Sequence, residues 1–267
     1  MAHGFDLARL GGLQGLDALV QAVLGAGDLA LSMQRDVLRG DGIARKADAS
    51  PVTVADEAVE ARLRAHVDAH HPEAGWLGEE TGSAAPDAAL RFIVDPIDGT
   101  RAYLRGLPTW SVLVAVEAEG VPSVGIAYLP ATGDLFVGVR GGGARVNGRP
   151  CRLSAVASLD EALVCHGALA QFTGAGRESA LGALARGTYT QRGIADFASY
   201  AALLRGQADA VVDPGVMPYD VAAAAVLVRE AGGRATDLRG HETVHGDGFV
   251  ASNGALHGPL LALLDAA

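Results

Sequence analysis

A short acidic segment at the end of an apolar run constrains this chain most. Asp95-Pro96-Ile97-Asp98-Gly99-Thr100 directly follows Phe92-Ile93-Val94. The apolar run predicts a buried strand, and Pro96 keeps the residue before it out of the helical region, so we expect a sharp turn there. Such a turn directs the Asp95 and Asp98 carboxylates and the Ile97 carbonyl at one place. The segment is therefore expected to bring three oxygen groups together where a strand ends.

These oxygen groups suit a hard cation next to an anion site. Mg²⁺ in proteins binds one or two carboxylates together with water and substrate phosphate. Gly99 and Thr100 follow at once, and the free N–H groups at the start of a helix bind anions. A plainer explanation is an Asp-Pro turn in which Asp98 caps the helix. The segment alone leaves both explanations open.

The first half of the chain predicts helices packed on an antiparallel sheet. Apolar positions at helical spacing indicate a helix over 14–39, a polar loop follows over 40–51, and Thr53 caps a second helix that ends near His70. Short apolar runs then predict strands, and Asn147-Gly148 predicts a hairpin turn. The expected strands are 76–78, 91–94, 111–117, 123–129 and 134–139.

After about residue 153 the pattern changes to alternating strands and helices. The expected strands are 162–165, 188–191, 210–212 and 249–251, and the expected helices are 178–186, 197–205, 221–230 and 259–264. This alternation favours a layered α/β arrangement. We therefore expect an α/β protein with two domains, an α+β lobe over 1–153 that carries most of the candidate metal ligands and an α/β lobe over 154–267.

Composition argues against several classes of function. With 267 residues, 49% of them hydrophobic, the chain is long and apolar enough for a large core. A net charge of −10 argues against a nucleic-acid surface, which needs clustered Lys and Arg. The two cysteines are too few for a Cys-rich zinc site or a disulfide framework, and we expect both to be reduced. Neither a signal peptide nor an uncharged apolar run of membrane-spanning length is evident, so we expect a cytoplasmic protein with no membrane partner.

Two more acidic segments strengthen the prediction of a catalytic centre. Glu79-Glu80 follows a predicted strand, and Asp220 comes directly before a predicted helix. Taken singly, a Glu pair in a loop is usually a solvated surface, and an acid at a helix start is a favourable partner of the helix dipole. Taken jointly, carboxylates at strand ends and helix starts are where an α/β enzyme assembles its site.

The ordered motifs Gly78-Glu79-Glu80, Asp95-Pro96-Ile97-Asp98-Gly99-Thr100 and Pro218-Tyr219-Asp220-Val221-Ala222 resemble those of the inositol monophosphatase superfamily. The resemblance extends from Ser50-Pro51-Val52-Thr53-Val54-Ala55-Asp56 to Glu230-Ala231-Gly232-Gly233. It implies an αβαβα layered sandwich and a phosphoric monoester hydrolase. It also implies two to three Mg²⁺ ions per site, inhibition by Li⁺ and a homodimer.

The resemblance further implies a role for each matched residue. A water activated by the metal ions attacks the phosphate, so no nucleophilic side chain is required. Thr100 and Asp56 orient this water, Glu79 belongs with them to the catalytic set, and Gly99 and Thr100 receive the phosphate. The implied metal ligands are Glu79, Asp95 and the Ile97 carbonyl for a first ion and Asp95, Asp98 and Asp220 for a second, while Asp56 reaches a weaker third ion mostly through water.

Within the superfamily, three segments resemble the histidinol-phosphatase branch, which acts in histidine biosynthesis. They are 103–110, 196–200, and Asp213 followed by 218–220. Inositol-specific members usually carry Trp where this chain has Tyr219 and a small residue where it has Asp196. Histidinol phosphate carries an ammonium group, with which Asp196 and Asp213 could pair as substrate contacts. Alternatively, Asp196 caps a helix and Asp213 ends a strand.

The sequence also leaves three other functions open. Inositol 1-phosphate is the second candidate substrate, and a nucleotide 3′-phosphate is the third. A non-catalytic phospholigand-binding protein would keep the fold, but it would need a broken metal set, whereas every matched side-chain ligand here is acidic. The expected binding partner is therefore a small phosphorylated metabolite.

Overall fold

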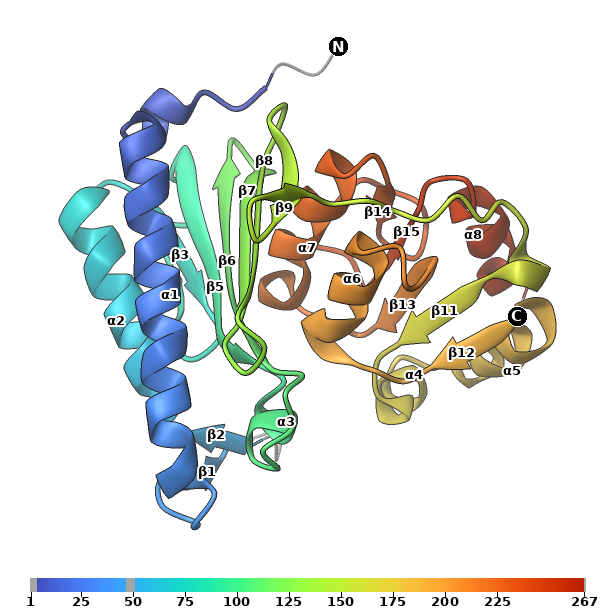
Figure 1. Ribbon diagram of the computed structural model, residues 1–267, viewed down its shortest axis with the longest axis horizontal. Coiled ribbons are helices and arrows are strands. Elements are labelled where there is room, and N and C mark those ends of the chain that lie inside the picture. The colour runs from blue at the N-terminus through green and yellow to red at the C-terminus, as the bar shows by residue number, and fades with distance from the viewer. Residues whose placement is uncertain (1–3, 47–50, 267) are drawn as a thin grey trace.

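The computed structural model describes residues 4–46 and 51–266, whose elements form two large sheets with helices between and outside them, and one small two-stranded sheet (Figure 1). The first half contains η1 (Leu7–Leu10), α1 (Gly12–Val37), β1 (Ile43–Arg45), β2 (Pro51–Thr53), α2 (Val54–His70), β3 (Gly75–Gly78), β4 (Gly82–Ala84), β5 (Leu90–Asp98), α3 (Thr100–Tyr103), β6 (Ser111–Ala118), β7 (Val121–Leu129), β8 (Asp134–Val139), β9 (Gly143–Val146) and β10 (Arg149–Pro150). The second half contains η2 (Leu159–Glu161), β11 (Leu163–His166), α4 (Leu169–Gly174), α5 (Glu178–Gly187), β12 (Thr190–Arg192), α6 (Asp196–Leu204), β13 (Ala210–Pro214), α7 (Pro218–Glu230), β14 (Arg234–Thr236), β15 (Gly248–Ser252) and α8 (His257–Asp265).

The first sheet has eight strands in the order β10-β9-β8-β7-β6-β5-β3-β4. Its neighbours are antiparallel, as the sequence predicts, except for β3 and β5, which run parallel. Helices α1 and α2 cover one face, and α7 from the second half of the chain covers the other. The apolar residues of this sheet are therefore buried on both sides.

Helix α1 is long and apolar enough to cross a membrane by length and composition alone. In the structure it packs against α2, β6 and β7. The residues that it buries recur at helical spacing and include Leu16, Leu19, Val23 and Ala30. An apolar stripe of this kind is the pattern of a helix that covers one face of a sheet.

The second sheet has five strands in the order β12-β11-β13-β15-β14. Strands β12, β11 and β13 are parallel, and β15 is antiparallel to both of its neighbours. Helices α6 and α7 lie between the two sheets, and α4, α5 and α8 lie on the outer face of the second. The layers therefore alternate helix, sheet, helix, sheet, helix, which confirms the expected αβαβα sandwich.

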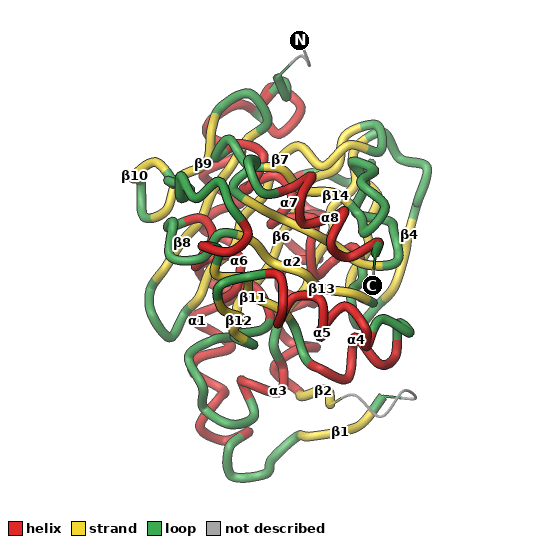
Figure 2. Tube along the Cα trace, turned by 90° about the vertical axis from the view of Figure 1, so that its right-hand side faces the viewer, coloured by secondary structure: helices red, strands yellow, loops and turns green. Residues whose placement is uncertain are grey.

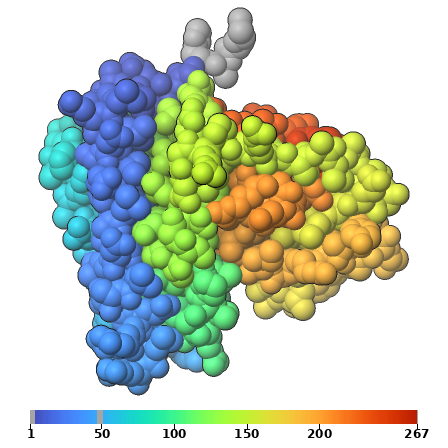
Figure 3. Space-filling view, in the orientation of Figure 1, coloured from blue at the N-terminus to red at the C-terminus, as the bar shows by residue number. Residues whose placement is uncertain are grey.

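The middle layer depends on small residues. Every residue of α7 from Val221 to Val228 is buried. On β7, a β-carbon placed on Gly125 would lie 2.5 Å from the Ala223 carbonyl oxygen, so glycine allows the helix to approach the strand. The space-filling view shows the two halves of the chain in contact along this layer (Figure 3). The division into domains at residues 153 and 154 stays a prediction.

The structure differs from the predicted elements in several places. Strand β5 continues to Asp98, so the chain does not turn at Pro96, and the expected sharp turn there was wrong. The predicted loop over 40–51 contains β1, which pairs with β2 beside α3 at one end of the molecule (Figure 2). Several short elements, among them β4, α4 and β14, were not predicted, because runs of three to six residues give too little periodicity to detect.

Candidate functional site

A bulge places the two acids of β5 on the same face of the first sheet. Side chains three positions apart on a regular strand point to opposite faces. On β6, however, Leu113 pairs with Asp95 and Ser111 with Asp98, so β5 has one residue more than β6 between these two points. Because of this extra residue, the two carboxylates lie on the same face of the sheet. Pro96 fits within the bulge, because it has no N–H to donate to a neighbouring strand.

Asp220 completes a group of three carboxylates. It is the third residue of α7, and its Oδ2 accepts a hydrogen bond from the Met217 N–H at 2.6 Å. Pro218 favours a helix start at this point, since proline fits the first helical turn. One carboxylate oxygen each from Asp95, Asp98 and Asp220 lies within 4.8 Å of the other two. The end of β5 and the start of α7 therefore meet at one acidic centre.

The three carboxylates repel one another in surroundings that water reaches poorly. Burial and then Glu79 raise the pKa of Asp95 well above its usual range, and burial and then Asp196 do the same for the pKa of Asp98. Burial raises the pKa of Asp220 to about 7. Asp95 is 2% exposed, and its Oδ1 has no hydrogen-bond partner among the described residues. Buried oxygen donors with unfavourable negative charge fit a hard divalent metal ion.

Gly99 and Thr100 form a helix start directly after these acids. Gly99 has a φ of +83°, which favours glycine, and α3 begins at the next residue. Thr100 Oγ1 lies 3.2 Å from the Ile97 carbonyl oxygen and 3.4 Å from Asp56 Oδ1. Because the first N–H groups of a helix have no acceptor within it, they can receive an anion beside the acidic centre.

Asp56 lies behind Thr100, in the first turn of α2. Its Oδ2 accepts hydrogen bonds from the Thr53 N–H at 2.8 Å and the Thr53 hydroxyl at 2.6 Å. The first of these bonds and the bond from the Asp56 N–H to Thr53 Oγ1 form a capping box at the helix start. Oδ1 is then free to face Thr100. Burial raises the pKa of Asp56 to about 6, although the bonds from Thr53 oppose this shift. One carboxylate therefore both caps α2 and orients the threonine of the site.

The turn that carries Glu79 is held from two sides. Lys46 Nζ lies 2.8 Å from a carboxylate oxygen of Glu79 and 2.8 Å from one of Glu80. Behind the turn, Glu60 accepts hydrogen bonds from the Glu80 N–H at 2.8 Å and the Thr81 N–H at 2.9 Å. Glu79 lies beside the acidic centre but outside the group of three carboxylates within 4.8 Å.

Asp196, Asp213 and Tyr219 form the opposite wall. Asp196 begins α6 with a strained φ of +52°, and its Oδ2 lies 2.7 Å from where a β-carbon on Gly99 would be. Asp213 is buried near the end of β13, and the Tyr200 hydroxyl donates to its Oδ2 at 2.6 Å. Burial raises the pKa of Asp196 and of Asp213 to about 6. This wall therefore presents two carboxylates to the acidic centre.

These residues surround a single pocket of about 590 Å³. It is lined by all of the predicted site residues except Asp56, which reaches it through Thr100: Glu79, Asp95, Ile97, Asp98, Gly99, Thr100, Asp196, Asp213, Tyr219 and Asp220. A cavity of this size accommodates a small metabolite. The structure brings the predicted residues together, and their chemical roles stay predictions.

Sequence reasoning missed three groups that position the site. The Ser111 hydroxyl and the Phe197 N–H both donate to Asp98 Oδ2, at 2.8 and 2.7 Å. Phe197 belongs to α6, so a backbone N–H that carries no sequence signal joins the second half of the chain to β5. Glu60 did carry a signal, because it is an acid four residues after Asp56 on the buried face of one helix.

Comparison with known proteins defines the class of this chain. The model of the inositol monophosphatase family matches residues 14–267. The histidinol-phosphatase of Mycobacterium tuberculosis is 40% identical over 226 residues, which are 83% of this chain and 87% of that protein. The inositol-1-monophosphatase of Rhizobium meliloti is 33% identical over 236 residues, 84% of this chain and 86% of that protein. The crystal structure of the extragenic suppressor protein suhB from Bartonella henselae superposes with a TM-score of 0.86 at 29% identity, over 93% of this chain and 97% of that one.

The fold and these relatives define the class of this chain as a phosphoric monoester hydrolase. Both relatives that are similar in sequence are named phosphatases. The chain belongs to the inositol monophosphatase family. The family is metal-dependent, and the group formed by Asp95, Asp98 and Asp220 could hold such an ion. Its members act on small phosphorylated metabolites, which agrees with the size of the acidic pocket.

Proposed function

We propose that this chain is a Mg²⁺-dependent phosphatase that hydrolyses histidinol phosphate. The observation that carries the proposal is the convergence of Asp95, Asp98 and Asp220 within 4.8 Å beside the helix start at Gly99 and Thr100. Hard oxygen donors that lie next to an anion-binding helix start are suited to bind a phosphate together with metal ions. The proposed metal ligands are these three acids together with Glu79 and the Ile97 carbonyl.

The choice of substrate is supported by the opposite wall. Histidinol phosphate carries an ammonium group and a protonatable imidazole, whereas inositol is an uncharged polyol. Asp196 and Asp213 offer carboxylates to these cationic groups, and charge-assisted hydrogen bonds in a closed site discriminate strongly. The greater identity to the histidinol-phosphatase of Mycobacterium tuberculosis, 40% against 33% for the Rhizobium meliloti inositol-1-monophosphatase, supports the same choice.

The residues of this chain then divide the work of the reaction. The N–H groups of Gly99 and Thr100 hold the phosphate, and Tyr219 with Asp196 and Asp213 orients the rest of the substrate. Thr100 Oγ1 and Asp56 position the attacking water, for which their 3.4 Å separation is suitable. Bound Mg²⁺ would supply charge neutralisation and polarise the phosphate and the water. We further propose inhibition by Li⁺, a homodimer and a cytoplasmic location.

The test is phosphate release with Mg²⁺ from histidinol phosphate, inositol 1-phosphate, a nucleotide 3′-phosphate and fructose 1,6-bisphosphate. We expect the highest kcat/KM for histidinol phosphate, loss of activity with EDTA and inhibition by Li⁺. A clear preference for inositol 1-phosphate would refute histidinol phosphate as the substrate. Phosphate release from none of them would indicate a non-catalytic phospholigand-binding protein instead.

Asp196→Asn tests the substrate contact itself. Asparagine tolerates the left-handed backbone at this position, so the change removes charge with little added strain. We expect KM for histidinol phosphate to rise roughly tenfold or more, in keeping with loss of one charge-assisted bond, while KM for inositol 1-phosphate stays within about twofold. An equal rise for both substrates would show that Asp196 does not recognise the cation.

A further inference from the structure

A second pocket lies behind the loop that leads into α7. Its volume is about 320 Å³, which is in the range of pockets that hold small molecules. Gly215 and Val216 line both this pocket and the acidic pocket, so the two share one wall. None of the predicted site residues lines the second pocket.

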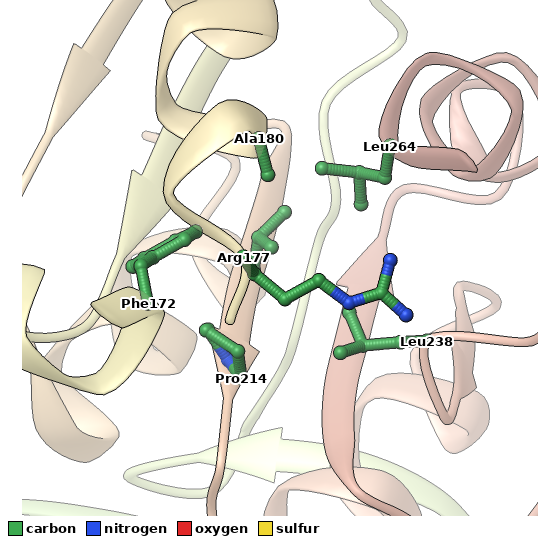
Figure 4. A pocket seen from close by; sticks show the side chains of 7 residues that line it. Phe172, Arg177, Ala180, Pro214, Leu238 and Leu264 are labelled. Atoms are coloured by element: carbon green, nitrogen blue, oxygen red, sulfur yellow. The ribbon is translucent and has the colours of Figure 1, made fainter. Parts of the chain in front are cut away.

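One side of the second pocket is apolar. Met217 is 51% exposed and lines it together with Val216 and Leu238. Next to it is a small cavity of about 10 Å³, which has room for no more than one water molecule. The two cavities share Leu238 and Arg177, and Figure 4 shows the Arg177 side chain extending between Leu238 and Leu264. The stem of this arginine is therefore packed among apolar groups.

The Arg177 guanidinium has no hydrogen bond or ion pair with any residue in the described part of the chain. Nor is its position explained by the helix that it precedes. It is the N-cap of α5, where it makes no side-chain cap, and a positive charge at a helix N-terminus is unfavourable. Arg177 as a whole is half-buried, and a guanidinium without an acceptor among the described residues is suited to bind a carboxylate through two parallel hydrogen bonds.

The acid on the same pocket wall does not oppose an anion strongly. Asp247 Oδ2 lies 2.9 Å from the Arg239 guanidinium, so its charge is compensated outside the pocket. We propose that the second pocket binds a small organic carboxylate with an apolar body. The carboxylate pairs with Arg177, and the body packs against Met217, Val216 and Leu238.

Occupation of the second pocket is coupled to the acidic centre through Met217. Its side chain lines the second pocket, while its N–H donates to Asp220 Oδ2 at 2.6 Å. A ligand packed on this side chain fixes the start of α7 and therefore the position of the Asp220 carboxylate. By linkage, the carboxylate and the metal ion change each other's affinity by the same factor. This coupling, unlike the binding of the carboxylate, rests on the proposed metal ligands.

Benzoate and its neutral analogue benzamide test the binding site. The chain has three methionines, so ¹³C-methyl methionine labelling gives a spectrum in which Met217 reports on the pocket and Met33, in α1, is an internal control. We expect benzoate to shift the Met217 resonance saturably, with Met33 unchanged, and benzamide to cause no saturable shift. Equal effects of the two compounds, or no saturable shift, would overturn the proposal.

Two arginine variants locate the anion. Arg177→Gln should weaken benzoate binding at least about tenfold, as loss of a charge-assisted pair predicts, whereas Arg186→Gln at the exposed end of α5 should leave it unchanged. Equal weakening in both variants would overturn the assignment to Arg177. Both variants should keep normal phosphate release without benzoate, which also shows that they fold.

Titration calorimetry with Mg²⁺, with and without saturating benzoate, then tests the coupling. We expect saturating benzoate to change the dissociation constant of Mg²⁺. Saturating Mg²⁺ should change the dissociation constant of benzoate by the same factor. Benzoate binding at Met217 with an unchanged Mg²⁺ constant would leave the site in place and refute the coupling. Absence of Mg²⁺ binding altogether would refute the proposed function and not the carboxylate site.

Discussion

Gly99 is the residue at which backbone conformation and site geometry meet. A side chain there must accept a φ of +83° and also fit 2.7 Å from Asp196 Oδ2. The control is Gly133, in the turn between β7 and β8, which has a φ of +71°. A β-carbon on Gly133 would have no atom of the described residues within 4 Å, apart from its own neighbours in the chain. The pair therefore separates strain from crowding.

We expect Gly99→Ala and Gly133→Ala each to lower the free energy of unfolding by ~1–2 kcal/mol, which is the cost of the left-handed conformation for alanine. Only Gly99→Ala should lower kcat/KM, by about tenfold or more, because the new methyl group displaces the Asp196 carboxylate. Denaturant unfolding and steady-state kinetics measure the two effects. Equal activity in the two variants would contradict the role given to Gly99.

The negative charge of Asp95 is buried among other carboxylates and is therefore unfavourable, and a bound metal ion would neutralise it. Because burial raises its pKa, we expect metal-free Asp95→Asn to be at least as stable as the natural chain near pH 7.5, yet to lose activity and any rise in Tm with Mg²⁺. Asp209→Asn is the control, since both Asp209 oxygens have partners, in Ser154 and the Leu163 N–H. It should lose ~1–3 kcal/mol of stability but keep the response to Mg²⁺. Near-normal turnover of Asp95→Asn with Mg²⁺ present would refute the metal site.

At the scale of elements, Glu60 shows how α2 positions the turn between β3 and β4. Glu60→Gln replaces an accepting oxygen by an amide that cannot accept, so the Glu80 or Thr81 N–H loses its partner. We expect a loss of ~1–3 kcal/mol in the free energy of unfolding and weaker Mg²⁺ binding, because Glu79 is on the same turn. Glu57→Gln, on the exposed face of α2, should change neither quantity. Identical behaviour of the two variants would contradict this positioning role.

The β5 bulge is the element-scale feature that the sequence concealed. Two acids three positions apart on a regular strand would face opposite sides, and only the extra residue opposite β6 brings Asp95 and Asp98 together. Pro96 indicated an irregularity, but it could not distinguish a turn from a bulge. That distinction depends on the pairing partner, and pairing is a tertiary property.

At the scale of the whole molecule, His257 joins α8 to the second sheet. Thr236 donates its hydroxyl hydrogen to the Asp237 carbonyl, so it accepts from His257 Nε2 at 2.9 Å, and Nδ1 accepts from the Ser252 hydroxyl at 3.0 Å. The imidazole is fully buried and neutral in this network. Burial, and then Arg234 and Arg229, lower its pKa from 6.5 to about 4.

The lowered pKa makes the outer helix layer sensitive to acid. Between pH 6.5 and 4, His257 is protonated in the unfolded chain but not in the folded chain. The contribution of the neutral His257 to the stability of the fold is therefore complete above pH 6.5 and is lost as the pH falls toward 4. The full difference is ~3 kcal/mol. We expect the stability of His257→Gln to fall less steeply than that of the natural chain between pH 7 and 4 in urea unfolding. Parallel pH profiles would show that His257 is not the titrating group.

The sequence predicted much of this protein because its information is local. Turn residues and hydrophobic periods marked most of the longer helices and strands, and the order of the acidic motifs identified the family. Expectations failed where the signal was short or depended on a partner, as with α4, β14 and the parallel pairing of β3 with β5. A period cannot be read from three residues, and strand direction is decided by neighbours in space.

By itself, then, the sequence determined which residues can supply the chemistry: the acids Asp95, Asp98 and Asp220, and the glycine that precedes α3. Only the tertiary structure decided how they act together. The bulge aligned two of the acids, α7 brought the third between the sheets, and the Phe197 N–H fixed Asp98 from the other half of the chain. The second pocket with Arg177 also exists only in three dimensions, because its walls come from segments far apart in sequence. Residue type sets the chemistry of each group, whereas distance and burial, which set its strength, arise from packing.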